Sequence, residues 1–136
     1  MKKYVLDSYA LISYIEGEYT GRPVAEIFKK ALRLEAELLV CVINWGEVCC
    51  TAFRDGGKPN AEFYRHSVAK FPITVLEANK ELTVQAATLK AKHKMSYADC
   101  FAAGLAKLQK AVLVTGDSEF KQVENEIKLL WLARSS

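Results

Sequence analysis

Short apolar runs alternate with longer amphipathic segments along the whole chain. The short runs, such as LLVCV and AVLV, predict buried strands, and the longer segments repeat their apolar residues at the 3.6-residue spacing of a helix. The predicted strands lie near 3–6, 38–42, 71–76, 111–115 and 128–132. The predicted helices lie near 8–16, 22–36, 44–55, 60–69, 78–93 and 97–109, with a short one from about 118.

Alternation of strand and helix predicts βαβ units with right-handed crossovers. We therefore expect an α/β fold of three α/β/α layers, with a central, mostly parallel five-stranded sheet. The chain of 136 residues contains no linker-like stretch and no internal repeat, so we expect one domain over 1–136. Parallel sheets carry their functional sites at the carboxyl ends of the strands, and the residues there are the first candidates for function.

Composition supports a soluble globular domain. Hydrophobic residues make up 51% and charged residues 26%, which excludes a disordered chain. No apolar stretch is long enough for a bilayer or a signal peptide, so we expect a cytoplasmic protein with no membrane contact. The four cysteines, Cys41, Cys49, Cys50 and Cys100, have neither C-x-x-C nor zinc-site spacing. Packed free thiols are the favoured interpretation, and a redox role stays open.

Acidic residues stand at the predicted strand ends. Asp7 ends the first strand, Glu47 follows the second within the first turn of a helix, and Asp117 follows the strand AVLV. Asp99 lies at the third position of a helix that Ser96 is expected to cap. Any one of these acids is most simply a helix cap or a first-turn acid, which the helix dipole favours. All four on one rim of the sheet indicate a shared site.

Carboxylates that converge in one cleft repel one another unless protons or cations compensate their charge. All-oxygen ligands suit a hard ion such as Mg²⁺ or Mn²⁺ and do not suit zinc. Such a site is well adapted to phosphodiester hydrolysis, because the ion activates water and stabilises the leaving oxygen. The acidic rim therefore predicts metal-dependent chemistry on phosphodiesters.

Four blocks of the chain together resemble the PIN domain, and specifically the VapC-type toxins of bacterial and archaeal toxin–antitoxin pairs. The blocks are LDSYALISYIEGE, INWGEVCCTAF, MSYADCFAAGLAK and LVTGDSEF, and they occur in the usual order over nearly the whole chain. The resemblance implies that Asp7, Glu47, Asp99 and Asp117 form the catalytic, metal-holding quartet and that Thr115 is the hydroxyl residue beside them. The block VTGD departs from the usual pattern, because a polar residue often stands in place of Gly116.

The resemblance also implies an activity and partners. It implies a ribonuclease that uses Mg²⁺ or Mn²⁺ to cut single-stranded or looped RNA, with tRNA or rRNA expected. As a toxin it would form homodimers and bind a VapB-like antitoxin. We look for the antitoxin on one apolar stripe, although a core-facing helix has the same pattern. The stripe consists of Leu11, Ile15, Val24, Ile27 and Phe28.

The charge balance is compatible with a polyanionic partner. The net charge is +3, and neutralising the four acids would leave nineteen basic residues against twelve acidic ones. Two basic groups are candidates for contact with the RNA backbone, although a solvated helix face explains each at least as well. They are Lys90, Lys92, His93 and Lys94, and Arg54, Lys58 and Arg65.

Four further residues near the acids have two interpretations each. Ser8 is expected to cap its helix more than to bind a ligand, and Glu119 to be a first-turn acid more than an outer metal ligand. Trp45 could stack a base, but packing against the core is favoured. Gly116 is expected only to free the turn after its strand.

Rival classes fit the chain less well. A signalling receiver needs an acidic pair after the first strand, and an aspartyl phosphatase needs D-x-D there, whereas the chain has Asp7-Ser8-Tyr9. Within the resemblance, a housekeeping RNA-processing nuclease and a non-catalytic binding domain stay open. The intact set of four acids favours catalysis, because a binding module has no need to bear their repulsion.

Overall fold

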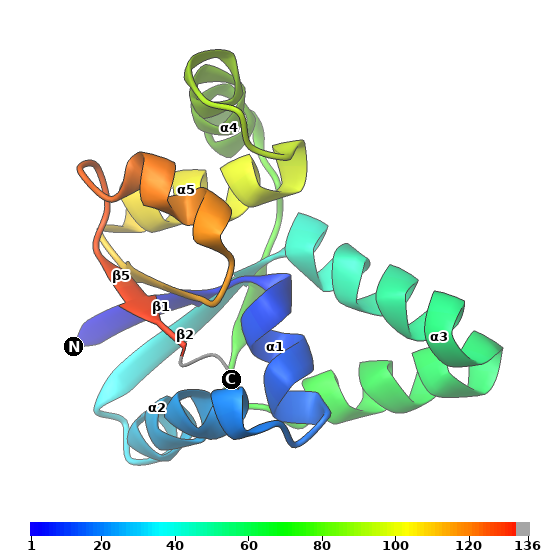
Figure 1. Ribbon diagram of the computed structural model, residues 1–136. Coiled ribbons are helices and arrows are strands. Elements are labelled where there is room, and N and C mark those ends of the chain that lie inside the picture. Colours follow the sequence, from blue (N-terminus) through cyan, green and yellow to red (C-terminus); the bar gives the residue numbers. More distant parts are fainter. Residues whose placement is uncertain (133–136) are drawn as a thin grey trace.

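A parallel five-stranded sheet forms the centre of the computed structural model, which describes residues 1–132 (Figure 1). The strands are β1 (Lys2–Leu6), β2 (Ala36–Cys41), β3 (Thr74–Leu76), β4 (Val112–Thr115) and β5 (Leu129–Trp131). Their order is β3-β2-β1-β4-β5, and every pairing in the described part of the chain is parallel. The predicted α/β class is confirmed. The predicted domain also includes residues 133–136, which lie outside the described residues.

The strand order creates a crevice at the carboxyl ends of β1 and β4. From β1 the chain proceeds outward to β2 and β3, and it then returns to the other side of β1 to add β4 and β5. This reversal of direction is the topological switch point at which open α/β sheets bind their ligands. The centre of the carboxyl edge is therefore where a site is expected.

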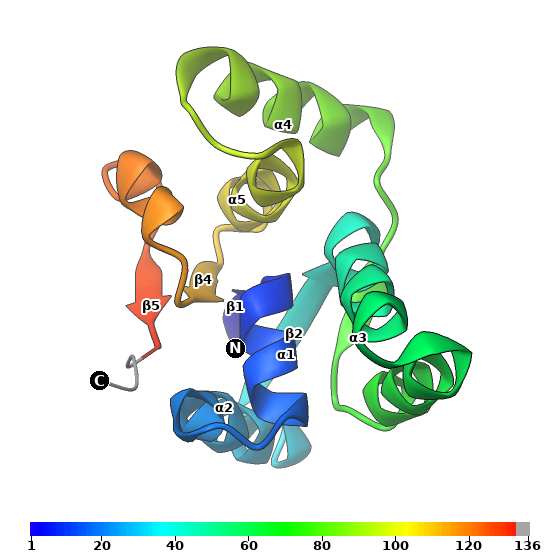
Figure 2. The same ribbon diagram turned by 45° about the vertical axis from the view of Figure 1, so that its right-hand side comes forward.

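Helices cover both faces of the sheet. They are α1 (Ser8–Ile15), α2 (Arg22–Leu32), α3 (Val42–Ala69), α4 (Lys80–Lys92) and α5 (Tyr97–Gln109), with the 3₁₀ helices η1 (Tyr19–Gly21) and η2 (Ser118–Val123). Figures 1 and 2 show α4 and α5 on one side of the sheet, and α1 and α2 on the other. The three layers agree with the prediction, and η1 is an element that the sequence pattern did not predict.

Two hydrophobic clusters separate the layers. Successive strand residues point to opposite faces, so that Val5, Leu39 and Leu113 pack with α4 and α5. Leu6 and Val40 pack in the cluster shared with α1, α2 and α3. Burial on both faces explains why these strands are continuously apolar in sequence. It also makes the buried carboxylate of Asp7, directly after β1, an exception that requires partners.

Some predicted boundaries are wrong for identifiable reasons. The helix predicted over 22–36 stops at Leu32, because Leu34 takes a left-handed conformation (φ 60°) and the chain then enters β2. The strand predicted over 71–76 begins only at Thr74. Pro72 has no N–H to give to a sheet, and the Ile73 N–H donates to the Phe71 carbonyl in a tight turn.

The two helices predicted over 44–55 and 60–69 are the arms of α3. The backbone leaves the helical conformation at Gly57 (φ 70°, ψ −165°), so that the arms fold back on each other (Figures 1 and 2). The Asn60 side-chain amide donates to the Ala52 carbonyl across the bend at 2.8 Å. The pair Gly56-Gly57 thus ends the first arm, as its sequence predicts.

The remaining predictions from composition have mixed outcomes. No helix within residues 1–132 is long and apolar enough to cross a membrane. All four cysteines are free thiols, and Cys41 and Cys100 are buried as expected. Cys50 is exposed on the outer surface of α3, so the prediction of a packed thiol is wrong for this residue.

Candidate active site

Asp7 is held by both of its carboxylate oxygens. Its Oδ1 accepts a hydrogen bond from the Ala10 N–H at 2.8 Å and so caps α1, and its Oδ2 accepts one from the Thr115 hydroxyl at 2.5 Å. Thr115 Oγ1 in turn accepts the Asp117 N–H at 3.0 Å. The cap is therefore Asp7, and the expectation that Ser8 caps this helix is wrong. The chain Asp7–Thr115–Asp117 joins the ends of β1 and β4.

Two more carboxylates, Asp99 and Glu119, lie close to Asp117 at the end of this series of hydrogen bonds. Oxygens of Asp99, Asp117 and Glu119 all lie within 4.8 Å of one another. Ser96 caps α5 as predicted, with its hydroxyl accepting the Asp99 N–H at 3.1 Å, and Asp99 is consequently buried at the start of that helix. The carboxylate of Asp117 accepts the Glu119 N–H at 2.9 Å. Glu119 is thus a member of the cluster as well as a first-turn acid.

Glu47 is fixed by a buried amide that the sequence reasoning did not single out. Asn44 is fully buried, and its Nδ2 donates to Glu47 Oε1 at 3.0 Å and to the Ala98 carbonyl at 3.1 Å. These two bonds tie the first turn of α3 to the first turn of α5. A polar residue three positions before Glu47 is the sequence signal, because the two side chains share a helix face.

Three of the four predicted acids, Glu47, Asp99 and Asp117, line one hollow of about 420 Å³. Its lining residues are Ser8, Tyr9, Ile12, Ser13, Glu18, Glu47, Ser96, Asp99, Asp117 and Glu119. Asp7 is only 2% exposed and does not line the hollow, although its charge interacts with those of Asp117 and Glu47. Neither lysine nor arginine is among the described lining residues. The structure thus places Glu47, Asp99 and Asp117 in the hollow, connects Asp7 and Thr115 to Asp117 from behind it, and adds Glu18 and Tyr9 to its lining.

The two buried carboxyls have strongly raised pKa values. Burial raises the pKa of Asp7 to about 7, with smaller contributions from Asp117 and Glu47, against the lowering effect of the hydrogen bonds from Thr115 and Ala10. Burial also raises the pKa of Asp99 to about 8, and a hydrogen bond with Glu119 and the charge of Asp117 add to this. The cluster therefore holds protons near neutral pH unless a cation replaces them.

The donor set fits a hard divalent cation. Carboxylate oxygens from Asp99, Asp117 and Glu119 are close enough to share one ion, and the cysteines and histidines do not belong to this cluster. Oxygen-only sites of this kind prefer Mg²⁺ or Mn²⁺ to zinc. A bound cation would also relieve the repulsion that raises the carboxyl pKa values.

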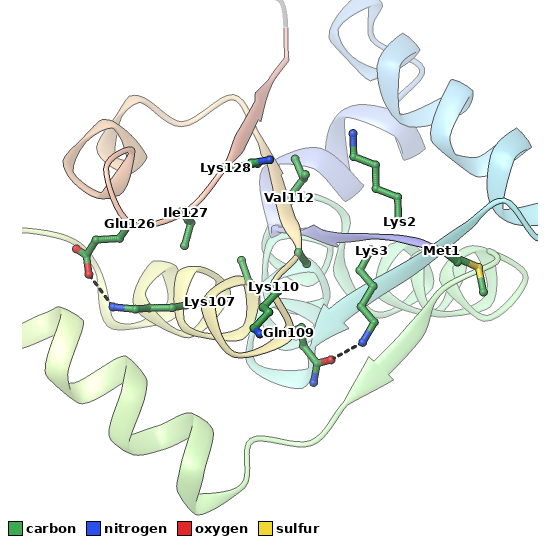
Figure 3. A pocket seen from close by; sticks show the side chains of 12 residues that line it. Met1, Lys2, Lys3, Lys107, Gln109, Lys110, Val112, Glu126, Ile127 and Lys128 are labelled. Atoms are coloured by element: carbon green, nitrogen blue, oxygen red, sulfur yellow. Dashed lines mark hydrogen bonds and ion pairs between the residues drawn. The ribbon is translucent and has the colours of Figure 1, made fainter.

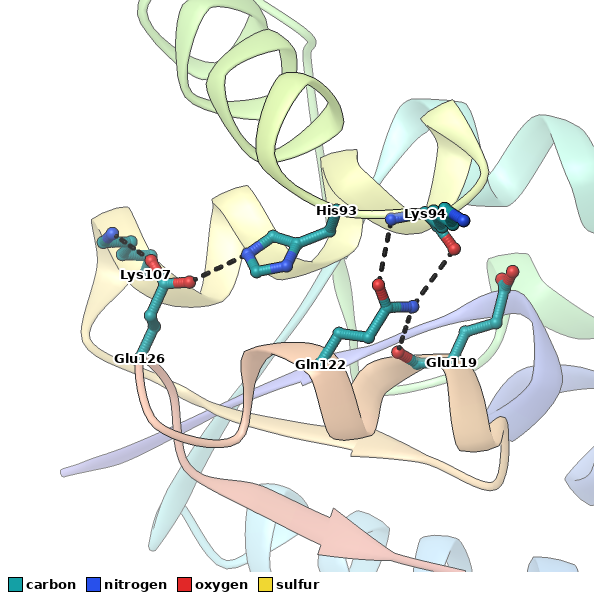
Figure 4. A network of polar contacts seen from close by, with 6 residues as sticks. All are labelled: His93, Lys94, Lys107, Glu119, Gln122 and Glu126. Carbon is teal, nitrogen blue, oxygen red and sulfur yellow. Dashed lines mark hydrogen bonds and ion pairs between the residues drawn. The ribbon is translucent and has the colours of Figure 1, made fainter.

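The segment before α5 is braced against η2, as Figure 4 shows. Gln122 accepts the Lys94 N–H at 2.9 Å and donates through its side-chain amide to the carbonyls of Lys94 (3.1 Å) and Glu119 (3.2 Å). Lys90 donates to the Met95 carbonyl at 2.7 Å. The Lys90 side chain, part of the basic group predicted to contact RNA, therefore has a structural role, whereas Lys94 contacts η2 through its backbone.

The other basic group lies on the outer surface of α3. Arg54, Lys58 and Arg65 are exposed, and none of them lines the acidic hollow. Trp45, in the first turn of α3, is partly buried against the core, as favoured from the sequence.

The apolar stripe expected to bind the antitoxin is not available at the surface. Leu11, Val24, Ile27 and Phe28 are all buried in the core, and Ile15 is half-buried against it. The stripe faces the sheet because α1 and α2 need an apolar face to pack there. The expectation of an antitoxin surface at these residues is wrong, and the core-facing alternative is confirmed.

A second hollow, of about 610 Å³, lies at the opposite edge of the sheet (Figure 3). Its lining includes Lys2, Lys3, Lys107, Lys110 and Lys128. Glu126, the carboxylate among its described lining residues, pairs with Lys107 at 2.8 Å and with His93 at 3.1 Å. The amino edge of the sheet is thus basic and the carboxyl edge acidic, and within residues 1–132 the potential metal ligands gather at the acidic edge.

Fold and site together define a parallel α/β protein with a carboxylate cluster at its topological switch point. The family model of the PIN domain matches residues 4–126. The chain therefore belongs to the PIN domain family. A search of curated proteins finds no significant sequence match.

Solved structures of similar fold cover almost the whole chain. VapBC2 of Rickettsia felis, bound to a DNA fragment from its promoter, superposes with a TM-score of 0.77 at 15% identity, over 96% of this chain and 99% of that one. DNA-bound VapBC of Salmonella typhimurium gives 0.73 at 19% identity, over 96% and 98%. The sarcin–ricin loop cleaving toxin VapC20 of Mycobacterium tuberculosis gives 0.65 at 14% identity, over 88% and 94%. At such identities the likeness establishes the fold.

Proposed function

We propose that the protein is a divalent-metal-dependent endoribonuclease that acts as the toxin of a VapBC-type toxin–antitoxin pair. The carrying observation is that Glu47, Asp99, Asp117 and Glu119 line one hollow at the switch point, with the buried Asp7 carboxyl close enough to interact with Asp117 and Glu47. Membership of the PIN family and the fold shared with VapBC complexes support the same activity.

Within this proposal each acid has a role. Asp99, Asp117 and Glu119 hold Mg²⁺ or Mn²⁺, and Asp7 and Glu47 complete the negative field around it. Thr115 orients Asp7 through its hydroxyl hydrogen bond, and Asn44 orients Glu47. Such an ion, when bound, supplies an activated water and stabilises the leaving oxygen of the phosphodiester.

The charge of the hollow supports a link between metal and substrate. Glu18, Glu47, Asp99, Asp117 and Glu119 line it, and no basic side chain is among its described lining residues. A phosphodiester would be repelled from five carboxylates unless cations neutralise them. We therefore expect RNA to enter the hollow only together with the metal.

The proposed partners follow the structural neighbours. Several of these are complexes of a toxin with its antitoxin, two of them bound to DNA, and VapC20 is described as cleaving the sarcin–ricin loop. By this analogy we expect RNA as substrate, with tRNA or rRNA as targets, and a VapB-like antitoxin as inhibitor. A homodimer acting in the cytoplasm completes the proposal.

Cleavage of a mixed-sequence fluorogenic RNA tests the activity. Metal-stripped protein should be inactive, and adding Mn²⁺ or Mg²⁺ should restore cleavage. Asp99→Asn should lower the rate at least about a hundredfold, because it removes a ligand of the cluster. Glu62→Gln is the matched control, since Glu62 is exposed on α3 away from the site, and it should retain full activity. Metal-independent cleavage, or equal loss in both variants, would contradict the assignment.

Growth arrest tests the toxin role separately. Induced expression of the wild-type chain in bacteria should stop growth, and expression of Asp99→Asn to the same level should not. A chain that cleaves RNA in vitro yet leaves growth unaffected would favour the housekeeping alternative.

A further inference from the structure

Tyr9 is an exposed aromatic side chain in the wall of the acidic hollow. It lies in the first turn of α1, two residues after Asp7, and remains 36% exposed. It lines the same hollow as Glu47, Asp99 and Asp117. Among the described residues that line the hollow, Tyr9 is therefore the aromatic one. Trp45, the aromatic residue singled out from the sequence, does not line it.

Gly116 makes room for this ring. A Cβ atom at position 116 would lie 2.3, 2.6 and 2.9 Å from Cε1, Cζ and Cδ1 of Tyr9. No side chain can occupy that space while the ring stays where it is, and Ala would already displace it. Gly116 therefore does more than free a turn: it lets the ring lie directly against the backbone that follows β4.

The Tyr9 ring has a fixed position relative to the acidic residues Asp7 and Asp117. Tyr9 follows Asp7 on α1, and it packs against the backbone between Thr115 and Asp117. Asp7, Thr115 and Asp117 are themselves connected by the hydrogen bonds that join β1 and β4. The position of the ring relative to the carboxylates is thus determined by the centre of the fold.

We infer that Tyr9 and Gly116 form a nucleobase subsite, in which a base next to the cleaved phosphodiester stacks on the exposed part of the Tyr9 ring. The inference rests on the proposed ribonuclease function. Stacking on an aromatic ring tolerates every base, because all bases present a π-face. The described lining of the hollow has no basic side chain to bind phosphate, and its apolar side chains are Tyr9 and Ile12, of which Tyr9 has the aromatic face on which a base can stack.

Two hydroxyl side chains extend the subsite. Ser8 and Ser96 line the hollow with Tyr9, and hydroxyls can both donate to and accept from base edges. A volume of about 420 Å³ lies within the range of small-ligand sites. We expect weak sequence preference from the hydroxyls on top of sequence-tolerant stacking.

RNA binding tests the subsite without cleavage. Fluorescence anisotropy with a labelled single-stranded RNA in Mg²⁺ is measured on the Glu47→Gln background, which keeps Asp99, Asp117 and Glu119 intact. Adding Tyr9→Leu should weaken binding roughly ten- to a hundredfold, the value of one stacked base. Tyr9→Phe should keep the parent affinity. Tyr19→Leu, which removes a tyrosine that is 60% exposed outside the hollow, is the matched control and should have no effect.

Two further arms separate stacking from a structural role. In a series of RNAs that each have an abasic nucleotide at a different position, one RNA should bind the parent more weakly than the intact RNA does. The Tyr9→Leu variant should bind that RNA and the intact RNA with equal affinity. Gly116→Ala should weaken binding as Tyr9→Leu does, but should cost little more in the Tyr9→Leu background, because the displaced ring is already absent. Melting temperatures report any loss of folding.

The outcomes for the inference and for the proposed function are distinct. Unchanged RNA binding by Tyr9→Leu would overturn the subsite, even if the wild-type chain cleaves RNA. Absence of cleavage by the wild type would overturn the nuclease, while anisotropy would still decide whether the ring contributes to RNA binding. A parent that binds no RNA in Mg²⁺ would overturn the subsite.

Discussion

Asp7 combines a structural role with a place in the acidic cluster. One oxygen caps α1 and the other accepts the Thr115 hydroxyl, so a cap and a functional carboxylate are the same group. Its surroundings nevertheless disfavour its charged form, since burial and neighbouring acids raise its pKa to about 7. The same is true of Asp99, whose pKa is raised to about 8. The residues of the site therefore destabilise the metal-free fold at alkaline pH.

The stability of metal-free protein should fall as pH rises from about 4 to about 8. An unfolded Asp ionises near pH 3.9, whereas Asp7 and Asp99 keep their protons in the fold up to pH 7 and 8, so the folded state binds more protons in this window. Stability that is fully present below pH 4 is lost progressively as the pH rises through the window. Urea unfolding in chelator at pH 5 and pH 8 measures the effect.

Substitutions distinguish this account from a general pH effect. Asp7→Asn and Asp99→Asn should each flatten the pH dependence, and each should be more stable than the wild type at pH 8, because an amide cannot ionise. Glu62→Gln should follow the wild-type curve. Wild-type stability that rises between pH 5 and pH 8 in chelator would contradict the raised pKa values.

At the scale of elements, two features of α3 determine where its acid lies and where the chain continues. One is the bend, at which Gly57 takes backbone angles (φ 70°, ψ −165°) that residues with a Cβ avoid. The other is the start of α3, where Asn44 links Glu47 to the start of α5. The first arm of α3 therefore positions an acid, and the bend returns the chain to the sheet.

Two glycines of α3 should respond to alanine with opposite signs. Gly57→Ala should destabilise the protein by roughly 1–3 kcal/mol, because Ala is strained at these angles. Gly46→Ala should stabilise it by about 0.5–1 kcal/mol, since Gly46 is helical and a Cβ there meets nothing within 4 Å. Denaturant unfolding of the two variants at pH 5 measures both. The same sign for both would contradict the assigned bend.

At the scale of the whole molecule, charge is divided between the two edges of the sheet. The carboxyl edge has the acidic hollow, and the amino edge has the hollow lined by Lys2, Lys3, Lys107, Lys110 and Lys128 (Figure 3). The net charge of +3 is thus the sum of a strongly acidic carboxyl edge and a basic remainder of the molecule. A cation bound at the acidic edge would stabilise the fold as well as enable the proposed chemistry.

Metal should raise the thermal stability of the wild-type chain. A ligand that binds only the folded state stabilises it by about 2.7 kcal/mol at a hundred times its Kd. We expect Mn²⁺ to raise the melting temperature at pH 8, and to do so less at pH 6, where protons compete for Asp7 and Asp99. Chelator should reverse the shift. Asp99→Asn should show little of it, whereas an equal shift in Asp99→Asn would place the ion elsewhere.

Sequence alone determined the class of fold and the main acids, because both depend on local patterns. Apolar runs and 3.6-residue repeats identify strands and helices, and an acid directly after a buried strand is visible as such. The cap at Ser96 and the break at Gly56-Gly57 are likewise decided by neighbouring residues. These features could therefore be predicted.

Only the tertiary structure decided what converges and what is covered. The contact between Tyr9 and Gly116 and the reach of Asn44 to Ala98 each join segments far apart in the chain. Glu18, directly before η1, and Glu119, in η2, line the hollow because these segments pack around it, and the apolar stripe of α1 and α2 is buried because it meets the sheet. The physical reason is the same in each case. The sequence pattern shows which face of an element is apolar or polar, whereas only the packing of the elements determines what that face contacts.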